Sequence, residues 1–246
     1  KPNKKDPIPE GLDWDAWIGP APYTDYISKY YHPGQWRKRL DYGTGTFGDM
    51  GCHIYDPTFK ALGLTYPISL RSEGPKPNQD NWGFDAIIHY TFPGNQYSKS
   101  KTLPVTWYDG TAQPPARIIN LLEGQKRPSQ GSIVVGTKGV MLIPHVGMPK
   151  LFPEKKFKDH KMEIVEKIHH WHSFIDAVRG EAPLPSANFD YSGPLTETVL
   201  LGGIATRFPK QELIWDAPNL SFKDNPKATA LVKKKYRKGW EVKGLS

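Results

Sequence analysis

The sequence has very little cysteine and no long hydrophobic run. Its 246 residues include one cysteine, Cys52. A single thiol excludes an intrachain disulfide framework and a zinc site built from several cysteines. No apolar stretch approaches the ~20 residues that a membrane-spanning helix needs, so we expect no membrane segment. No signal peptide is visible. Because the chain does not begin with Met, the compartment stays open between cytoplasm and periplasm.

Motifs of several common enzyme classes are also missing, including a nucleophile-elbow serine, a Walker loop and HExxH. Residues 43–48, GTGTFG, do match the dinucleotide pattern G-x-G-x-x-G. That pattern needs a buried strand before it, a helix after it and an acidic residue about 20 positions further on. The preceding QWRKRLDY is a poor buried strand, and the first acidic residue beyond Asp56 is Glu73. We therefore expect these glycines to serve a tight turn and close packing.

Glycine, proline and basic residues are abundant. The 23 glycines and 24 prolines argue against a long helical bundle, because both residues interrupt helices. The net charge is +8, with lysines concentrated in 1–5 and 233–238. Blocks of like charge at chain ends are typically solvated. Nucleic-acid binding, which Tyr236 and Trp240 among the lysines would suit, is therefore a minor alternative, and we expect no nucleic-acid partner.

Hydrophobic periodicity predicts an α+β fold with a mostly antiparallel sheet. Residues 1–10 read as a linker and 11–246 as one α+β domain. Alternation over 82–92 predicts a strand with one buried face. Further strands are expected at 66–72, 103–108, 132–143 (two, joined by GTKG) and 212–216. Helices are expected at 46–62 (kinked at Pro57), 162–178, 194–207 and about 226–238.

The segment GDMGCHIYD, residues 48–56, is the strongest candidate for chemistry. Asp49, His53 and Asp56 follow i, i+4, i+7 spacing, which puts them on one face of a helix. An imidazole can exchange a proton with a substrate while a neighbouring carboxylate orients it. The alternative is that the aspartate stabilises the N-terminus of the helix and that the histidine is buried in the core with its hydrogen bonds made. Two carboxylates and one histidine without a further ligand make a weak metal site, and we predict no metal.

Three weaker motifs have structural alternatives. TWYDG, 106–110, combines aromatic faces with a carboxylate, as sugar sites do, or forms core packing and an Asp-Gly turn. NFDYSGPLTET, 188–198, has the residues of a helix start. In IHHWH, 168–172, His169 and His172 lack a third ligand, so partly exposed helix histidines are the favoured interpretation.

Together these segments resemble one branch of the Gfo/Idh/MocA family, the relatives of glucose–fructose oxidoreductase and inositol dehydrogenase. The resemblance covers about residues 11–240. It is carried, in order, by GLDWDAWIGPAP, YHPGQWR, DYGTGTFGDMGCHIYD, TWYDG, GTKGVML, NFDYSGPLTETVLLG and YRKGW. It implies the family's C-terminal domain: an open, mostly antiparallel sheet with helices on one face, similar to the C-terminal fold of glyceraldehyde-3-phosphate dehydrogenase.

The family's N-terminal Rossmann domain, with its glycine-rich loop and catalytic lysine in an EKP motif, is missing from this chain. Residues 1–10 would be the linker that follows it. The resemblance implies NAD or NADP in the full-length protein and none bound to this chain. It also implies a homodimer or homotetramer formed through the sheet.

The family's D-x-x-x-H pair falls on Asp49 and His53. The resemblance implies that His53 is a general acid/base at a sugar hydroxyl, assisted by Asp49. It implies that the pocket is lined by Trp36, Arg37, Trp107, Tyr108 and Asp190. We therefore expect the substrate-binding, catalytic half of a nicotinamide-dependent oxidoreductase acting on a sugar or polyol, inactive on its own. The alternative is a non-catalytic carbohydrate-binding or scaffolding module.

Overall fold

The computed structural model describes residues 1–165 and 167–244, which form two compact units. The first unit comprises Lys1–Cys52, Tyr66–Gln113 and the chain from Thr198 onward. The second comprises His53–Thr65 and Pro114–Glu197. Two long helices, α2 (Gly45–Ala61) and α5 (Phe189–Ala205), each contribute residues to both units.

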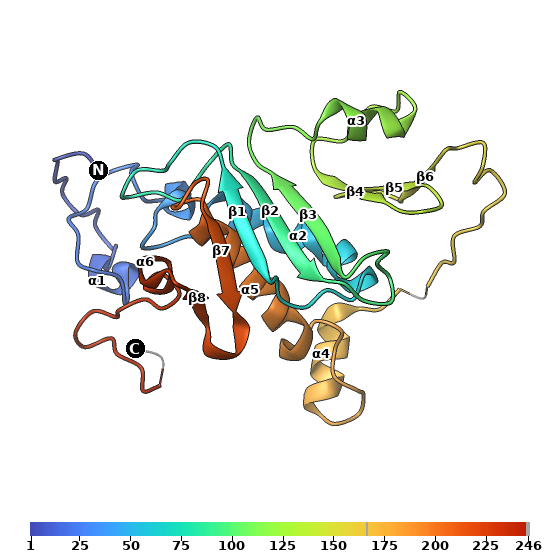
Figure 1. Cartoon of the computed structure of the whole chain (residues 1–246). Helices are drawn as coiled ribbons and strands as arrows, with labels where there is room; N and C mark the ends of the chain where they lie inside the picture. The colour runs from blue at the N-terminus through green and yellow to red at the C-terminus, as the bar shows by residue number, and fades with distance from the viewer. Residues whose placement is uncertain (166, 245–246) are drawn as a thin grey trace. The chain divides into compact units, whose positions relative to one another are not determined.

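A five-stranded antiparallel sheet forms the centre of the first unit (Figure 1). Its order is β3-β2-β1-β7-β8, and its registers include Leu70 opposite Tyr90 and Ile88 opposite Trp107. The strands are β1 (Ser69–Glu73), β2 (Ile87–Pro93), β3 (Thr102–Tyr108), β7 (Glu212–Asp216) and β8 (Ser221–Lys223). Mixed helices and antiparallel strands confirm the predicted α+β class.

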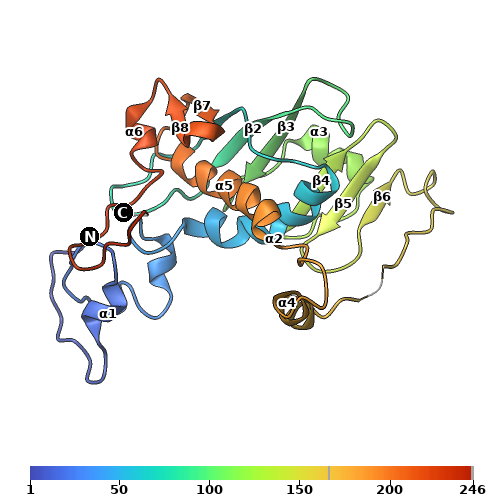
Figure 2. The same ribbon diagram turned by 90° about the horizontal axis from the view of Figure 1, so that it is seen from below.

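One face of this sheet is buried beneath helices. In β2 the alternating side chains of Ile88, Tyr90 and Phe92 are at most 1% exposed, as the period of two predicts. The first half of α2 and the second half of α5 pack against this face (Figure 2). The predicted strand 82–92 begins only at Ile87, because Asp85 adopts a left-handed conformation with φ 57°.

The aromatic segment near the N-terminus folds into a small core of its own. Helix α1 (Trp14–Ile18) begins where the Asp13 carboxylate accepts a hydrogen bond from the Ala16 amide. Trp14 stacks on Trp17 with ring centroids 4.7 Å apart and meets Tyr26 edge-on. A short 3-10 helix, η1 (Gln35–Lys38), follows. The large rings thus order a segment that has no regular period.

The second unit contains a three-stranded antiparallel sheet with the order β4-β5-β6. The predicted hairpin is confirmed as β4 (Gly131–Val135) and β5 (Val140–Pro144), while β6 (Lys150–Phe152) was not predicted. Two short helices, α3 (Ala116–Ile119) and η2 (Asn120–Leu122), precede the hairpin. One buried hydrophobic cluster beneath this sheet consists of Leu122, Val140, Leu142 and Phe152.

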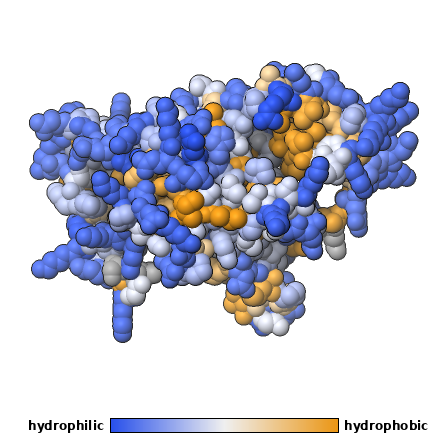
Figure 3. Space-filling view, in the orientation of Figure 1, coloured by the Kyte–Doolittle hydropathy of each residue, from blue (hydrophilic) through white to orange (hydrophobic). Residues whose placement is uncertain are grey.

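The bounds of two helices differ from those that the sequence predicts. The helix expected over 162–178 is α4 (His170–Val178), with residue 166 outside the described part. Its apolar side chains, such as Trp171 at 67% exposed, lie on the surface (Figure 3). Because they pack against little else, tertiary contacts do not stabilise a longer helix. Helix α5 conversely begins earlier than predicted, where the Asn188 side chain accepts the Asp190 amide. No helix within 1–165 and 167–244 is long and apolar enough to cross a membrane.

The basic segment near the C-terminus is mostly not helical. After η3 (Ala217–Asn219), helix α6 spans only Pro226–Thr229, not 226–238. The amide of Arg237 donates to the Pro20 carbonyl, and its guanidinium pairs with Asp15. These long-range contacts replace the intrahelical bonds that the local pattern predicted.

Two adjacent glycines of α5 provide a test of the packing. A Cβ on Gly202 would lie 2.0 Å from the Tyr90 hydroxyl and 2.2 Å from the Phe47 ring, whereas one on Gly203 would meet Trp82 at 3.5 Å. We expect Gly202→Ala to lower the free energy of unfolding by about 2–3 kcal/mol through overpacking. Gly203→Ala, the matched control, should change it by less than about 1 kcal/mol. Equal effects of the two variants in urea denaturation would contradict this packing.

Candidate functional site

Helix α2 presents the Asp49 and His53 side chains to solvent. Its apolar residues recur at helical spacing, and Phe47, Ile54 and Phe59 are buried. Asp49 and His53, one turn apart on this continuous helix, are both exposed. The helix thus has one packed face and one face that carries the predicted acid/base pair, and His53 is not a core histidine.

Arg37 lies beside the Asp49 carboxylate. Its Nε lies 3.8 Å from Asp49 Oδ1, and its guanidinium lies over the Trp36 ring, 4.7 Å from the centroid. Both partners of the pair are about half exposed, so the pair adds little to stability. Its effect is to bring together Trp36 and Arg37 of η1 with Asp49 of α2, three residues that sequence analysis placed in one pocket.

His53 has a second imidazole beside it. The rings of His53 and His145 have centroids 5.8 Å apart. His145 follows β5, and its Nδ1 lies 2.9 Å from Gln130 Oε1. Sequence analysis missed His145, because the two histidines are far apart in the chain and share no spacing motif. No sequence pattern indicates His145, because its position depends on how β4 and β5 pair.

Asp56, the third member of the predicted face, has a structural contact. Its carboxylate accepts a 2.7 Å hydrogen bond from the Tyr191 hydroxyl. Burial, together with this carboxylate, raises the pKa of Tyr191 above its usual range. Asp56 therefore joins α2 to the first half of α5 within the second unit, and its carboxylate is already engaged.

His169 is the N-cap residue of α4, and His170 and His172 lie in its first turn. The Nδ1 of His169 accepts the His172 amide at 3.4 Å, and the two rings stack. This geometry agrees with the interpretation of IHHWH as helix histidines. Among the residues that the structure describes, no group of three or more His, Cys, Asp or Glu side chains is placed to hold a metal ion.

The other predicted pocket residues occupy different elements. Trp107 of β3 packs against Phe47 of α2, with centroids 4.5 Å apart, two residues from Asp49. Tyr108, at the end of β3, is half-buried opposite Ile87. Asp190 is exposed in the first turn of α5 and belongs to the second unit. The first unit thus combines Trp107 with the helix that carries Asp49, and a role for Tyr108 or Asp190 stays a prediction.

Asp109 of the TWYDG motif is buried in a turn. It is 4% exposed, and one carboxylate oxygen accepts the Gly110 amide at 2.9 Å. Burial raises the pKa of Asp109 to about 6, with a smaller contribution from the nearby charge of Asp85. The structural interpretation of this motif as an Asp-Gly turn therefore fits better than an open sugar-binding carboxylate.

The GTGTFG segment has a packing role. It follows the 3-10 helix η1, so it does not connect a buried strand to a helix. A Cβ on Gly43 would lie 2.0 Å from the Arg37 carbonyl oxygen, and one on Gly45, where φ is 72°, would lie 2.7 Å from Trp82. The bare backbone is needed for these contacts, as expected. These residues do not form a phosphate cradle.

Comparison with known families identifies one match. The profile described as the oxidoreductase family, C-terminal alpha/beta domain, matches residues 2–242, nearly the whole chain. No curated protein matches the chain.

The buried carboxyl of Asp109 predicts a pH-dependent stability. Its folded pKa of about 6 exceeds the usual ~3.9, so its contribution is favourable below pH 4 and is lost as the pH rises through 6. Asp109→Asn should therefore unfold like the unchanged protein at pH 4 and be more stable by roughly 1–2 kcal/mol at pH 7.5. Denaturation across this range, with exposed Asp159→Asn as control, checks it. A constant difference at all pH values would contradict the assignment.

Proposed function

The chain belongs to the Gfo/Idh/MocA oxidoreductase family as its C-terminal domain, and we propose that it binds a sugar or polyol and transfers the proton during oxidation of one hydroxyl. The observation that carries the proposal is the exposed His53 imidazole, one turn of α2 from the Asp49 carboxylate, which pairs with Arg37. The family match supports the oxidoreductase class, and the pair supports the substrate chemistry.

Oxidation of an alcohol removes a proton from oxygen and a hydride from carbon. In this proposal the neutral His53 imidazole accepts the hydroxyl proton and returns it in the reverse reaction. Side chains at i and i+4 have Cβ atoms about 6 Å apart, a spacing that suits neighbouring hydroxyls of one polyol. Asp49 would accept a hydrogen bond from the second hydroxyl and stabilise the imidazolium.

The hydride acceptor in this proposal is NAD or NADP, which supplies a carbon that takes up hydride. Gly43 and Gly45 pack against Arg37 and Trp82, and this segment does not offer the amide cradle that a pyrophosphate requires. The nicotinamide cofactor does not fit these residues. We therefore assign this chain the substrate and the proton, and we place the cofactor on another part of the full-length protein.

The remaining pocket residues would position the sugar. The Trp36 ring, beside the Arg37–Asp49 pair, offers an apolar face for the C–H groups of a sugar ring. Trp107 would support α2 through Phe47. Arg37 and Tyr108 would supply hydrogen bonds to hydroxyl groups, and a role for Asp190 stays what the family resemblance implies. These roles complete a site with one catalytic imidazole and several binding groups.

We also propose that copies of the chain pair through the open face of the five-stranded sheet. That face includes the exposed side chains of Arg71, His89 and Ile214. Mixed polar and apolar side chains are typical of interfaces between subunits. Pairing there would leave the exposed face of α2 free for substrate.

Replacing His53 tests the proposed chemistry. We expect His53→Ala, in the longest form of the protein that its gene encodes, to lower kcat for polyol oxidation at least about 100-fold, because the proton acceptor is lost. The measurement is nicotinamide reduction over a panel of sugars and polyols.

Cys52→Ala is the matched control, because Cys52 is the exposed neighbour of His53 on α2. It should retain activity close to that of the unchanged protein. An active protein whose kcat is unaffected by His53→Ala would contradict the catalytic role. A full-length protein that binds sugars and oxidises none would favour the non-catalytic alternative.

A further inference from the structure

A large cavity lies in the first unit, and all the residues that line it belong to that unit. Its volume is about 1030 Å³, at the upper end of the range of roughly 300–1,000 Å³ for small-molecule sites. Three stretches of chain enclose it: residues 16–22, 36–42 and 230–240, together with Trp82. The cavity therefore depends on segments from both ends of the chain.

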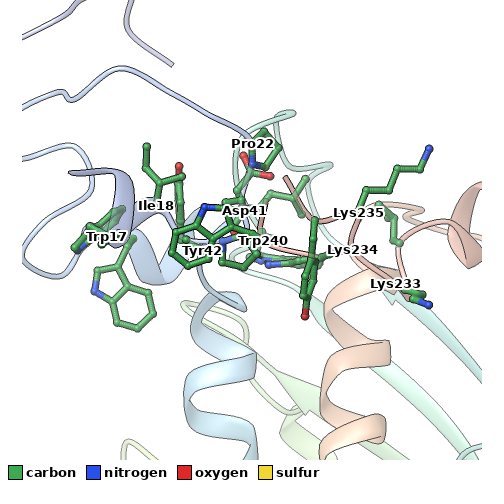
Figure 4. A pocket seen from close by; sticks show the side chains of 18 of the residues that line it. Trp17, Ile18, Pro22, Asp41, Tyr42, Lys233, Lys234, Lys235 and Trp240 are labelled. Carbon is green, nitrogen blue, oxygen red and sulfur yellow. Dashed lines mark hydrogen bonds between the residues drawn. The ribbon is translucent and has the colours of Figure 1, made fainter. Parts of the chain in front are cut away.

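Six half-buried aromatic side chains line this cavity. None is completely covered and none is fully exposed, so each leaves part of a ring available. They are Trp17, Trp36, Tyr42, Trp82, Tyr236 and Trp240. Figure 4 shows Trp17, Tyr42 and Trp240 around the cavity. Rings that keep one face open offer apolar platforms to the C–H faces of a sugar.

Hydrogen bonds across the cavity hold its walls in place. The Arg237 guanidinium donates to the Gly19 carbonyl at 3.0 Å, and the Lys234 ammonium donates to the Asp41 carbonyl at 3.0 Å. The Trp82 indole donates to the Gly43 carbonyl at 2.6 Å. The C-terminal segment is thereby tied to both other walls, which makes the cavity a formed site.

The charged groups at the cavity are mainly basic. Lys233, Lys234 and Lys235 line it against one carboxylate, that of Asp41. Figure 4 shows Lys233 and Lys235 directed outward at one edge, where ammonium groups can meet an anion without losing their hydration. The Asp41 carboxylate requires a hydrogen-bond donor, which sugar hydroxyls supply and a flat aromatic anion lacks.

We propose that this cavity binds an anionic carbohydrate, a sugar bearing a carboxylate or phosphate. The aromatic walls take the sugar rings, Asp41 accepts hydroxyl hydrogen bonds, and the lysines at the edge meet the negative group. The volume accommodates more than one ring. This cavity shares the Trp36 ring with the proposed substrate pocket but contains neither Asp49 nor His53, so the proposal stands whether or not His53 is catalytic.

Ligand-observed NMR and calorimetry on the chain test the proposal with four matched probes. Sodium glucuronate and glucose 6-phosphate carry both ring and charge and distinguish the two anion sources. Glucose carries only the ring, and acetate carries only the charge. We expect at least one of the first two to bind about tenfold more tightly than glucose or acetate, and to weaken as salt is added. Binding of neither, or equal binding of glucose or acetate, overturns the proposal.

Variants place the binding in the cavity. Trp240→Ala should weaken binding about tenfold, and the double variant Lys233→Gln/Lys235→Gln about threefold to fivefold. The controls are Trp171→Ala, an exposed indole on α4, and Lys155→Gln/Lys158→Gln, which removes the same charge from the second unit. Both controls should leave affinity unchanged. Equal losses in the lysine pairs would show only a net-charge effect and overturn the assigned site.

Discussion

The close approach of α2, α5 and β2 at Gly202 is the constraint on which the first unit depends. A side chain at Gly202 would overlap both the Phe47 ring and the Tyr90 hydroxyl. That hydroxyl donates a buried hydrogen bond of 2.9 Å to the Thr198 carbonyl. Interiors are packed at crystal-like density, so contacts this close fix the rotation of the helices. With Phe47 buried, the Asp49 side of α2 faces outward.

The orientation of α2 determines what chemistry the chain can offer. The two ends of the helix are held separately: Phe47 packs in the first unit, and in the second the Ser132 hydroxyl donates to the Ile54 carbonyl. Asp49 and His53 lie on the solvated face between these anchors. Charged groups remain hydrated there, so the fold incurs no desolvation cost for keeping a carboxylate and an imidazole available to substrate.

Sequence patterns correctly predicted those strands and turns that depend mainly on their own residues. The alternation Ile88, Tyr90, Phe92 identified the central strand, and GTKG identified the hairpin of β4 and β5, because each pattern reports its own burial or turn. The short strands β6 and β8 were missed, since three residues are too few to show an alternation of buried and exposed side chains. The helix expected to 238 ends at Thr229 because Arg237 bonds to residues near the opposite end of the chain. Distant partners also explain why His145 and the aromatic cavity were not predicted.

The part of the candidate site that could be predicted is the pair of residues whose relative position is set by spacing along one helix. Asp49 and His53 are one turn apart in any α-helix, and their exposure agrees with the expectation that they meet a substrate. Asp56 and Asp109 have the right residue type but are engaged in contacts with Tyr191 and Gly110. Sequence spacing could not distinguish these structural carboxylates from an available one, because the distinction comes from tertiary burial.

Chemical rescue tests the central claim, that the His53 imidazole moves the substrate proton, most directly. The measurement is the polyol oxidation rate of His53→Ala as free imidazole is added, in the longest form of the protein that the gene encodes. Because His53 lies on the exposed face of α2, a small base can reach the vacated position. We predict a rate that rises with imidazole concentration and saturates, with no such rise for the unchanged protein. A rate that stays flat in the variant while the unchanged protein is active would contradict the account.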